Sequence, residues 1–213
     1  MLGPGRRTVL WFQGCALDCP GCIAFEMNRS SDHRLYRAEQ LADRVISGGG
    51  QVEGITLSGG DPFDQPLDEL HRFLKCVRES SSLSVMCYTG RTLSELNRHP
   101  QQNIVQQILS HTDILIDGRY VEDRNDGALW RGSSNQTVHF LSERYQYLAA
   151  DFETVNQREV EIELTADDQL LIAGIPRPGF MNTLSQRLSE RGFDLGLSTA
   201  ATNQQCPVTK EAN

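Results

Sequence analysis

Hydrophobic and polar positions follow two alternating patterns along residues 8–117. Short apolar runs rich in β-branched or aromatic residues have the composition of buried strands, at 8–13, 55–57, 83–88 and 113–117. Between them, apolar residues recur every three or four positions, which predicts amphipathic helices at 38–47, 66–79, 92–97 and 101–109. Strands that alternate with helices through short loops predict a parallel sheet. Because the units are too few to close eight strands, we expect an α/β fold, an incomplete parallel (β/α) barrel.

The pattern changes near residue 142, after a further expected strand at 137–141. Charged and apolar residues alternate at 159–164, a polar turn follows, and a second strand is expected at 169–175, which together predict a β-hairpin. A helix is expected from Phe180 to Arg191, and its apolar face of Met181, Leu184 and Leu188 is expected to pack against the barrel or a partner. We therefore divide the chain into three parts: a partial barrel at 1–141, an appended C-terminal extension at 142–197, and a polar tail at 198–213 that we expect to be disordered.

Composition excludes several classes of function. A chain of 213 residues with 38% hydrophobic residues is long enough to bury one good core. A net charge of −8 argues against non-specific binding to nucleic acid or to an anionic membrane surface. No apolar run approaches the length of a membrane span. We expect a protein of the reducing cytoplasm.

The cysteines supply the strongest chemical signal. Cys15, Cys19 and Cys22 lie in one loop with the spacing CxxxCxxC, and Pro20-Gly21 lets that loop curl so that the sulfurs converge. Thiolates grouped this closely usually bind a soft metal or an iron–sulfur cluster. Three thiolates leave one iron of a 4Fe–4S cluster without a protein ligand, and an open metal position is able to bind substrate.

Two other interpretations of the cysteines stay open on the spacing alone. One is a structural zinc site whose fourth ligand comes from a histidine or from Cys76, Cys87 or Cys206. The other is a set of disulfides, although three neighbouring cysteines cannot pair among themselves and disulfide frameworks suit small secreted domains.

Polar and glycine residues follow the predicted strands at their carboxyl ends. Gly59-Gly60-Asp61 follows the second strand, Thr89-Gly90 the third, and Asp117 ends the fourth. Glycines there let a backbone approach a ligand closely, although a plain tight turn before a helix is the alternative. Since sites in parallel α/β folds lie at the carboxyl ends of the strands, we expect these segments and the cysteine loop to meet.

Taken together, these motifs resemble the radical S-adenosylmethionine enzymes, in the branch of small activating enzymes of glycyl radical proteins such as anaerobic ribonucleotide reductase. The resemblance extends over about two-thirds of the chain, in the segments 3–6, 11–15, 19–22, 57–62, 88–90, 114–120 and 129–136. It implies that Cys15, Cys19 and Cys22 hold a 4Fe–4S cluster whose open iron chelates the amino and carboxylate groups of S-adenosylmethionine. One-electron reduction would then cleave the sulfonium to methionine and a 5′-deoxyadenosyl radical.

The resemblance also implies residues that contact S-adenosylmethionine, and no catalytic residue beyond the cluster and cofactor sites. These are Gly21 and Ile23 near the adenine, Gly59, Gly60 and Asp61 near the methionine amino group, Asp117, Gly118 and Arg119 near the ribose and carboxylate, and the adjoining Ser58 and Thr89. The sequence departs from the family pattern at the third cysteine, where Gly21 and Ile23 stand in place of an aromatic neighbour. Residues 142–213 have no counterpart in a minimal activating enzyme.

The implied partners are a glycyl radical protein and an electron donor of the flavodoxin or ferredoxin type. We expect the partner's glycyl loop to enter beside the strand ends that carry Gly60, Thr89 and Asp117, with 130–134 lining the approach or forming a structural turn. Two alternatives are a radical S-adenosylmethionine enzyme that modifies a peptide, and a structural metal-binding module that only mediates interactions.

Overall fold

The protein is described from a computed structural model, which covers residues 2–22, 24, 27, 34–48, 51–150, 152, 160–164, 170–176 and 179–193. The predicted tail at 198–213, with Cys206, lies outside the described residues. The fold is mixed α/β, with a five-stranded sheet in the order β1-β2-β3-β4-β5 and a separate two-stranded sheet near the C-terminus. No helix among the described residues is long and apolar enough to cross a membrane.

Four strands of the main sheet are parallel, as the sequence pattern predicts. They are β1 (Arg7–Phe12), β2 (Gly54–Gly59), β3 (Ser84–Tyr88) and β4 (Ile114–Asp117). The fifth strand, β5 (Thr137–Phe140), runs antiparallel to β4. A parallel strand needs a crossover connection, and residues 118–136 contain only the short helix η2 (Glu122–Arg124) in place of a crossover helix. The chain therefore turns back along the edge of β4.

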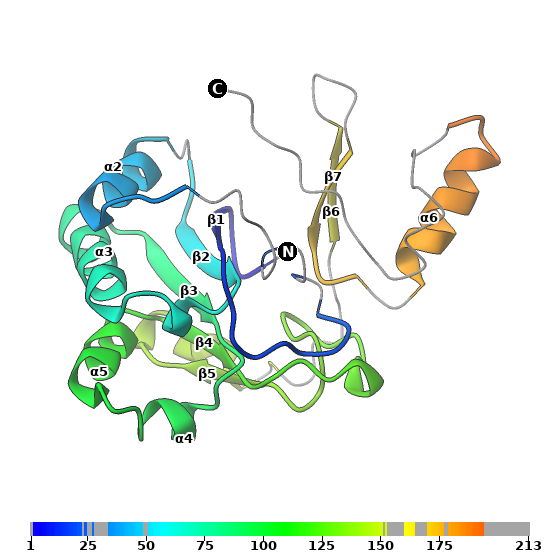
Figure 1. Cartoon of the computed structure of the whole chain (residues 1–213). Coiled ribbons are helices and arrows are strands. Elements are labelled where there is room, and N and C mark those ends of the chain that lie inside the picture. Colours follow the sequence, from blue (N-terminus) through cyan, green and yellow to red (C-terminus); the bar gives the residue numbers. More distant parts are fainter. Residues whose placement is uncertain are drawn as a thin grey trace.

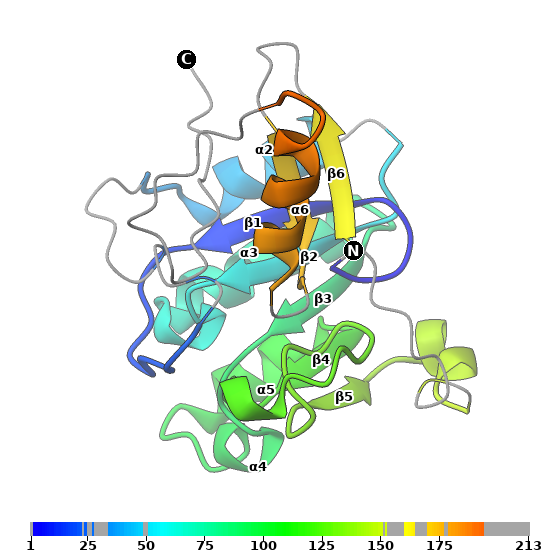
Figure 2. The ribbon, with the colours of Figure 1, turned by 90° about the vertical axis from the view of Figure 1, so that its right-hand side faces the viewer.

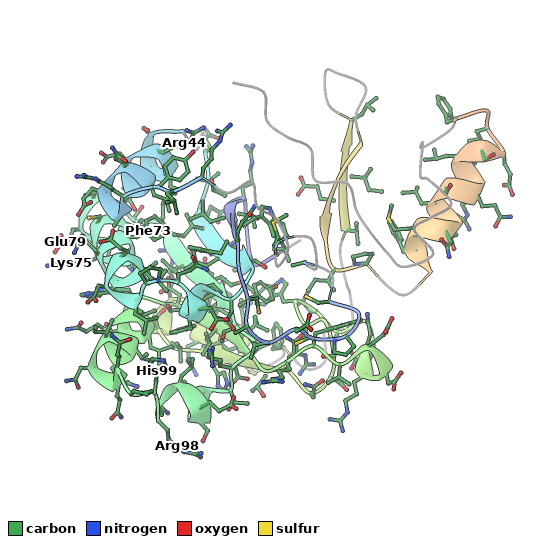
Figure 3. The ribbon with its side chains drawn as sticks, viewed as in Figure 1. Arg44, Phe73, Lys75, Glu79, Arg98 and His99 are labelled. Atoms are coloured by element: carbon green, nitrogen blue, oxygen red, sulfur yellow. The ribbon has the colours of Figure 1, made fainter. Side chains whose placement is uncertain are left out.

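Helices cover one face of this sheet (Figure 1). They are α2 (Ala38–Gly48), α3 (Leu67–Ser80), α4 (Leu93–Leu96) and α5 (Gln102–Ser110), close to the predicted ranges. Phe73 of α3 is buried in the core beneath them, whereas Lys75 and Glu79 lie on the outer side of the same helix (Figure 3). The core on this face also contains Ile55 and Leu57 of β2. Burial of apolar side chains between helices and sheet is the main term that stabilises this arrangement.

The opposite face of the sheet carries a second, smaller apolar cluster. Its buried members come from β3 and β4, from the connection between β4 and β5, and from the segment after β5: Met86, Ile114, Ile116, Trp130, Tyr145 and Phe152. Tyr145 lies in the short helix η3 (Glu143–Leu148), and its hydroxyl donates a 2.9 Å hydrogen bond to Ser84 Oγ. The start of the C-terminal extension is thereby attached to the sheet.

The rest of the extension is a hairpin and a helix, which confirms these predicted elements. Strands β6 (Val160–Leu164) and β7 (Leu170–Gly174) pair antiparallel, and α6 (Phe180–Ser189) follows. They stand on the side of the sheet away from α2, α3 and α5 (Figure 1, Figure 2). Met181, Leu184 and Leu188 of α6 are only partly buried, because no described element packs extensively against the helix. The predicted packing of this face against the barrel is therefore wrong, and its packing against a partner stays a prediction.

Candidate cofactor site

The carboxyl ends of the parallel strands open into one cavity of about 150 Å³. The loop after β1 lines it with Cys15, Leu17, Cys19 and Cys22. The carboxyl ends of the next strands line it too, with residues 58–61 at the end of β2, 88–90 at the end of β3 and Gly118 after β4. The expectation that these segments meet is therefore confirmed. Most of the wall is apolar, so charged or polar groups inside the cavity are partly shielded from water.

The three cysteines of the loop are free thiols that face this cavity together. Burial raises the pKa of Cys22, and the nearby thiols of Cys19 and Cys15 raise this pKa further. Burial also raises the pKa of Cys15, with a smaller contribution from the carboxylates of Asp61 and Asp64. These thiols are therefore close enough to repel one another when ionised, and a cationic metal group offsets that repulsion and favours their thiolate forms.

The donor set fits an iron–sulfur cluster with three protein ligands. Cys76 on α3 and Cys87 on β3 both pack into the core on the helical face, away from this cavity. Cys206 lies outside the described residues. Within the described part of the chain, no three His, Cys, Asp or Glu side chains lie close enough to hold one metal ion. Each cysteine of a 4Fe–4S cluster binds a different iron, so the three sulfur atoms need not surround one common metal ion.

The glycine pair brings the end of β2 against the cysteine loop. A Cβ atom on Gly60 would lie 2.2 Å from the carbonyl oxygen of Gly14, one residue before Cys15. Gly59 has a φ of 92°, a conformation that favours glycine. The N–H of Gly60 donates a 2.7 Å hydrogen bond to Phe12 O. Larger residues would push the two loops apart.

Asp61 is buried, and its carboxylate joins the loops after β2 and β3. It accepts hydrogen bonds from Phe63 N–H at 2.9 Å, from the Thr89 hydroxyl at 3.0 Å and from Gly90 N–H at 3.1 Å. Burial raises the pKa of Asp61, and these hydrogen bonds oppose that rise. The carboxylate therefore holds two walls of the cavity in fixed positions.

Asp64 was not predicted from the sequence, yet it anchors the cysteine loop. It lies in the short helix η1 (Pro62–Asp64), and one carboxylate oxygen accepts a 2.7 Å hydrogen bond from the N–H of Ala16. The other oxygen pairs with the guanidinium of Arg91, which follows β3. A charge-assisted pair with fixed geometry of this kind is among the stronger polar contacts in proteins.

Not every residue implied by the resemblance lines the cavity. Gly118 does, but Gly21, Asp117 and Arg119 are not among its lining residues, and Ile23 lies outside the described residues. The Asp117 carboxylate accepts a 2.6 Å hydrogen bond from Leu93 N–H and lies 3.0 Å from His139 Nε2. Burial acts to raise the pKa of Asp117, but these neighbours outweigh it and the pKa is lowered.

Several lining residues were not selected from the sequence. Tyr120, Gly132 and Gln136 fall inside segments that carry the resemblance, so the signal was present but not assigned to single residues. The Gln136 side chain accepts a 2.7 Å hydrogen bond from Gly132 N–H and donates one of 2.8 Å to Gly118 O, which folds this segment onto the strand ends. Trp11 also lines the cavity and belongs to the resembling segment 11–15, whereas no motif indicated the lining residues Leu2, Gly174 and Ile175.

A cysteine loop that meets glycine turns at the carboxyl ends of parallel strands defines a cluster site in an α/β protein. Comparison with protein families matches residues 1–139 to the family described as "4Fe-4S single cluster domain". Curated relatives that match are named anaerobic ribonucleoside-triphosphate reductase-activating protein. The one from Escherichia coli K12 is 34% identical over 145 residues, which cover 65% of this chain and 91% of the relative.

Two further relatives with the same name extend the comparison. The protein of Salmonella typhimurium LT2 is 36% identical over 146 residues, with 65% of this chain and 91% of the relative covered. That of Enterobacteria phage T4 is 28% identical over 141 residues, with 64% and 85% covered. The chain belongs to the 4Fe–4S single cluster family and to that of the anaerobic ribonucleoside-triphosphate reductase-activating proteins. No solved structure matches the chain significantly.

Proposed function

We propose that the chain is a radical S-adenosylmethionine enzyme that installs a glycyl radical on an anaerobic ribonucleoside-triphosphate reductase. The observation that carries this proposal is a match over about nine-tenths of the length of reductase-activating proteins, at 34–36% identity. The cavity supports it, because the segments that carry the resemblance meet there: the cysteine loop, the glycine pair, Thr89 and Gly118.

Cys15, Cys19 and Cys22 are the proposed ligands of the 4Fe–4S cluster. When bound, the cluster supplies the electron that cleaves the sulfonium of S-adenosylmethionine to methionine and a 5′-deoxyadenosyl radical. Two contacts position the cysteine loop, which we call the cluster loop from here on. The Asp64 carboxylate accepts a hydrogen bond from it, and Gly60 lies close to Gly14 at its start. A loop held by contacts of this kind keeps the ligand geometry that electron transfer needs.

The proposed S-adenosylmethionine contacts come from the strand ends around the cluster loop. Ser58, Gly59 and Gly60 expose backbone groups to the cavity, which suits the charged methionine end of the cofactor. Asp61 and Thr89 line the cavity as well. Because the Thr89 hydroxyl also donates a hydrogen bond to Asp61, these residues hold the strand ends together in addition to their proposed contact with the cofactor. The implied roles of Gly21, Ile23, Asp117, Gly118 and Arg119 remain proposals.

The apolar wall of the cavity serves the radical chemistry. Trp11, Leu17 and Tyr88 line it and keep water away from the reacting groups. The glycyl loop of the partner is proposed to enter beside the strand ends at Gly60, Thr89 and Asp117, because hydrogen transfer requires van der Waals contact. Gly132 lines the cavity, which supports a place for 130–134 along that approach, whereas Trp130 is buried in the second apolar cluster.

Three further expectations belong to this proposal. The parallel strands β1–β4 with helices on one face support an arc of an incomplete (β/α) barrel as the cofactor-binding unit at 1–141, with 142–197 as an extension. A flavodoxin- or ferredoxin-type protein is the proposed electron donor. The described cysteines are all free thiols, which supports a reducing, cytoplasmic compartment.

Anaerobic reconstitution with iron and sulfide tests the proposal against its alternatives. Near four irons per chain, with 5′-deoxyadenosine formed when reductant and S-adenosylmethionine are added, is the expected result. One tightly held zinc and no nucleoside product would identify a structural metal-binding module instead. Nucleoside formation that never yields a radical on the reductase would favour a peptide-modifying enzyme.

A further inference from the structure

The C-terminal extension reaches the cofactor cavity, although it lies beyond residues 1–139, which match the family model. The match to the E. coli relative covers 91% of that protein but only 65% of this chain. Gly174 and Ile175, at the end of β7, nevertheless line the same cavity as the cluster-loop cysteines. The hairpin therefore contributes to the site a wall that the matched family region, residues 1–139, does not contain.

Ile175 is buried at the cavity, whereas two apolar residues of β6 are exposed. Ile175 is only 9% exposed, whereas Ile162 and Leu164 on β6 are 45% and 67% exposed. A buried apolar side chain that lines the cavity forms part of its wall, so Ile175 is placed to contact what the cavity binds.

The backbone at this point has a conformation that favours glycine. Gly174 has a φ of 132°, where side chains of L-residues are strained, and it is the last residue of β7. The chain changes direction there, and the next residue is the buried Ile175. Leu2, also buried and lining the cavity, is fixed to the sheet because its carbonyl oxygen accepts a 2.7 Å hydrogen bond from the Thr56 hydroxyl.

We propose that Ile175 contacts S-adenosylmethionine as part of the wall of the cofactor cavity. This inference rests on the proposed function, since it requires that the cavity binds this cofactor. An apolar side chain there contacts the apolar surface of the bound adenosyl group and excludes water from it. The extension thereby completes the cofactor cavity of this chain, instead of serving only as a separate module.

The test measures S-adenosylmethionine affinity directly, by equilibrium dialysis of labelled cofactor against the reconstituted full-length protein under anaerobic conditions. Ile175→Ala is expected to raise the Kd about tenfold, because it removes apolar surface that contacts the bound cofactor. Ile175→Val is expected to restore most of the affinity. Ile162→Ala, on the exposed part of the same hairpin, is the matched control and is expected to leave the Kd within about twofold of wild type.

Iron content and thermal unfolding of the variants are recorded beside the Kd. Equal iron content with a weakened Kd only in Ile175→Ala supports the inference. A Kd unchanged in Ile175→Ala, or weakened equally in Ile162→Ala, overturns it. The reductase is absent from this assay. A wild-type protein that binds the cofactor but never activates a reductase thus contradicts the proposed partner alone, and one that does not bind the cofactor contradicts both proposals.

Discussion

The carboxylate of Asp64 accepts a 2.7 Å hydrogen bond from the backbone N–H of Ala16, the residue that follows the first cysteine of the cluster loop. The same carboxylate pairs with Arg91, which lies after β3. Three loops at the carboxyl ends of β1, β2 and β3 are thereby joined through one side chain. The cluster loop is irregular, so its position depends on such anchors more than on regular secondary structure.

We predict that Asp64→Ala loosens the cluster loop. The variant loses a hydrogen bond to a charged group and an ion pair that is partly exposed, and about 1–2 kcal/mol of the free energy of unfolding is expected to be lost. Iron content after reconstitution should fall below that of wild type. The exposed Asp68→Ala on the neighbouring helix is the control, and equal iron content in both variants would show that Asp64 does not anchor the loop.

The ligand assignment predicts a sharp division among the cysteines. Cys15→Ala, Cys19→Ala and Cys22→Ala should each abolish cluster binding and cleavage of S-adenosylmethionine, because three thiolates are already the smallest set that holds the cluster. Cys76→Ala and Cys206→Ala should retain both. Iron and sulfide analysis with the absorbance of the cluster gives the measurement. Loss of the cluster in Cys76→Ala would overturn the assignment.

Gly60 should tolerate no side chain. In Gly60→Ala the new Cβ would meet the backbone oxygen of Gly14, which has no rotamer through which to move aside, and the cluster loop must shift. We expect a loss of iron content that is greater than the loss of thermal stability. Gly48→Ala at the end of α2 is the control, because open space surrounds that position, and its iron content should equal that of wild type.

Asp117 gives a prediction with a defined pH dependence. Its pKa is lowered from the ordinary 3.8 in the folded chain, so the ionised carboxylate stabilises the fold above pH 3.8 and that contribution is lost as the pH falls through the lowered pKa. The stability difference between wild type and Asp117→Asn should be about 1 kcal/mol near neutral pH and should disappear in strong acid. Urea unfolding across this range measures it.

The same variant separates two roles for this residue. If Asp117 only caps α4 through Leu93 N–H, Asp117→Asn should bind S-adenosylmethionine as wild type does. A weakened Kd, measured under conditions in which the variant is fully folded, would support the direct cofactor contact that the sequence resemblance implies.

Local patterns predicted most of the fold because strands and helices here bury strongly periodic apolar faces. Phe73 and Leu57 illustrate this, since each occupies the inner face that its spacing indicates. The antiparallel direction of β5 was not predicted, because it depends on the path of a long connection. The incomplete burial of the apolar face of α6 was not predicted either, because periodicity shows that a face is apolar but not whether anything covers it.

Site residues could be predicted where metal binding or a close backbone contact allows only one type of residue. The cysteine loop and Gly60 carry such requirements and were found from spacing. Asp64 and Ile175 were not, because a carboxylate that bonds one backbone N–H, or an apolar residue at a strand end, has no local signature. Asp117 was selected by its position after a strand, but the cavity does not include it.

The most direct test of the proposed function is the electron paramagnetic resonance spectrum of the activated partner. Reduced, reconstituted protein is mixed anaerobically with S-adenosylmethionine and the anaerobic ribonucleoside-triphosphate reductase of the same source, and the spectrum is recorded. A doublet is predicted, because the remaining α-hydrogen of the glycyl radical splits the signal. It should collapse to a singlet when the reductase contains glycine deuterated at the α-carbon. Formation of 5′-deoxyadenosine with no doublet on the reductase would contradict the proposed function.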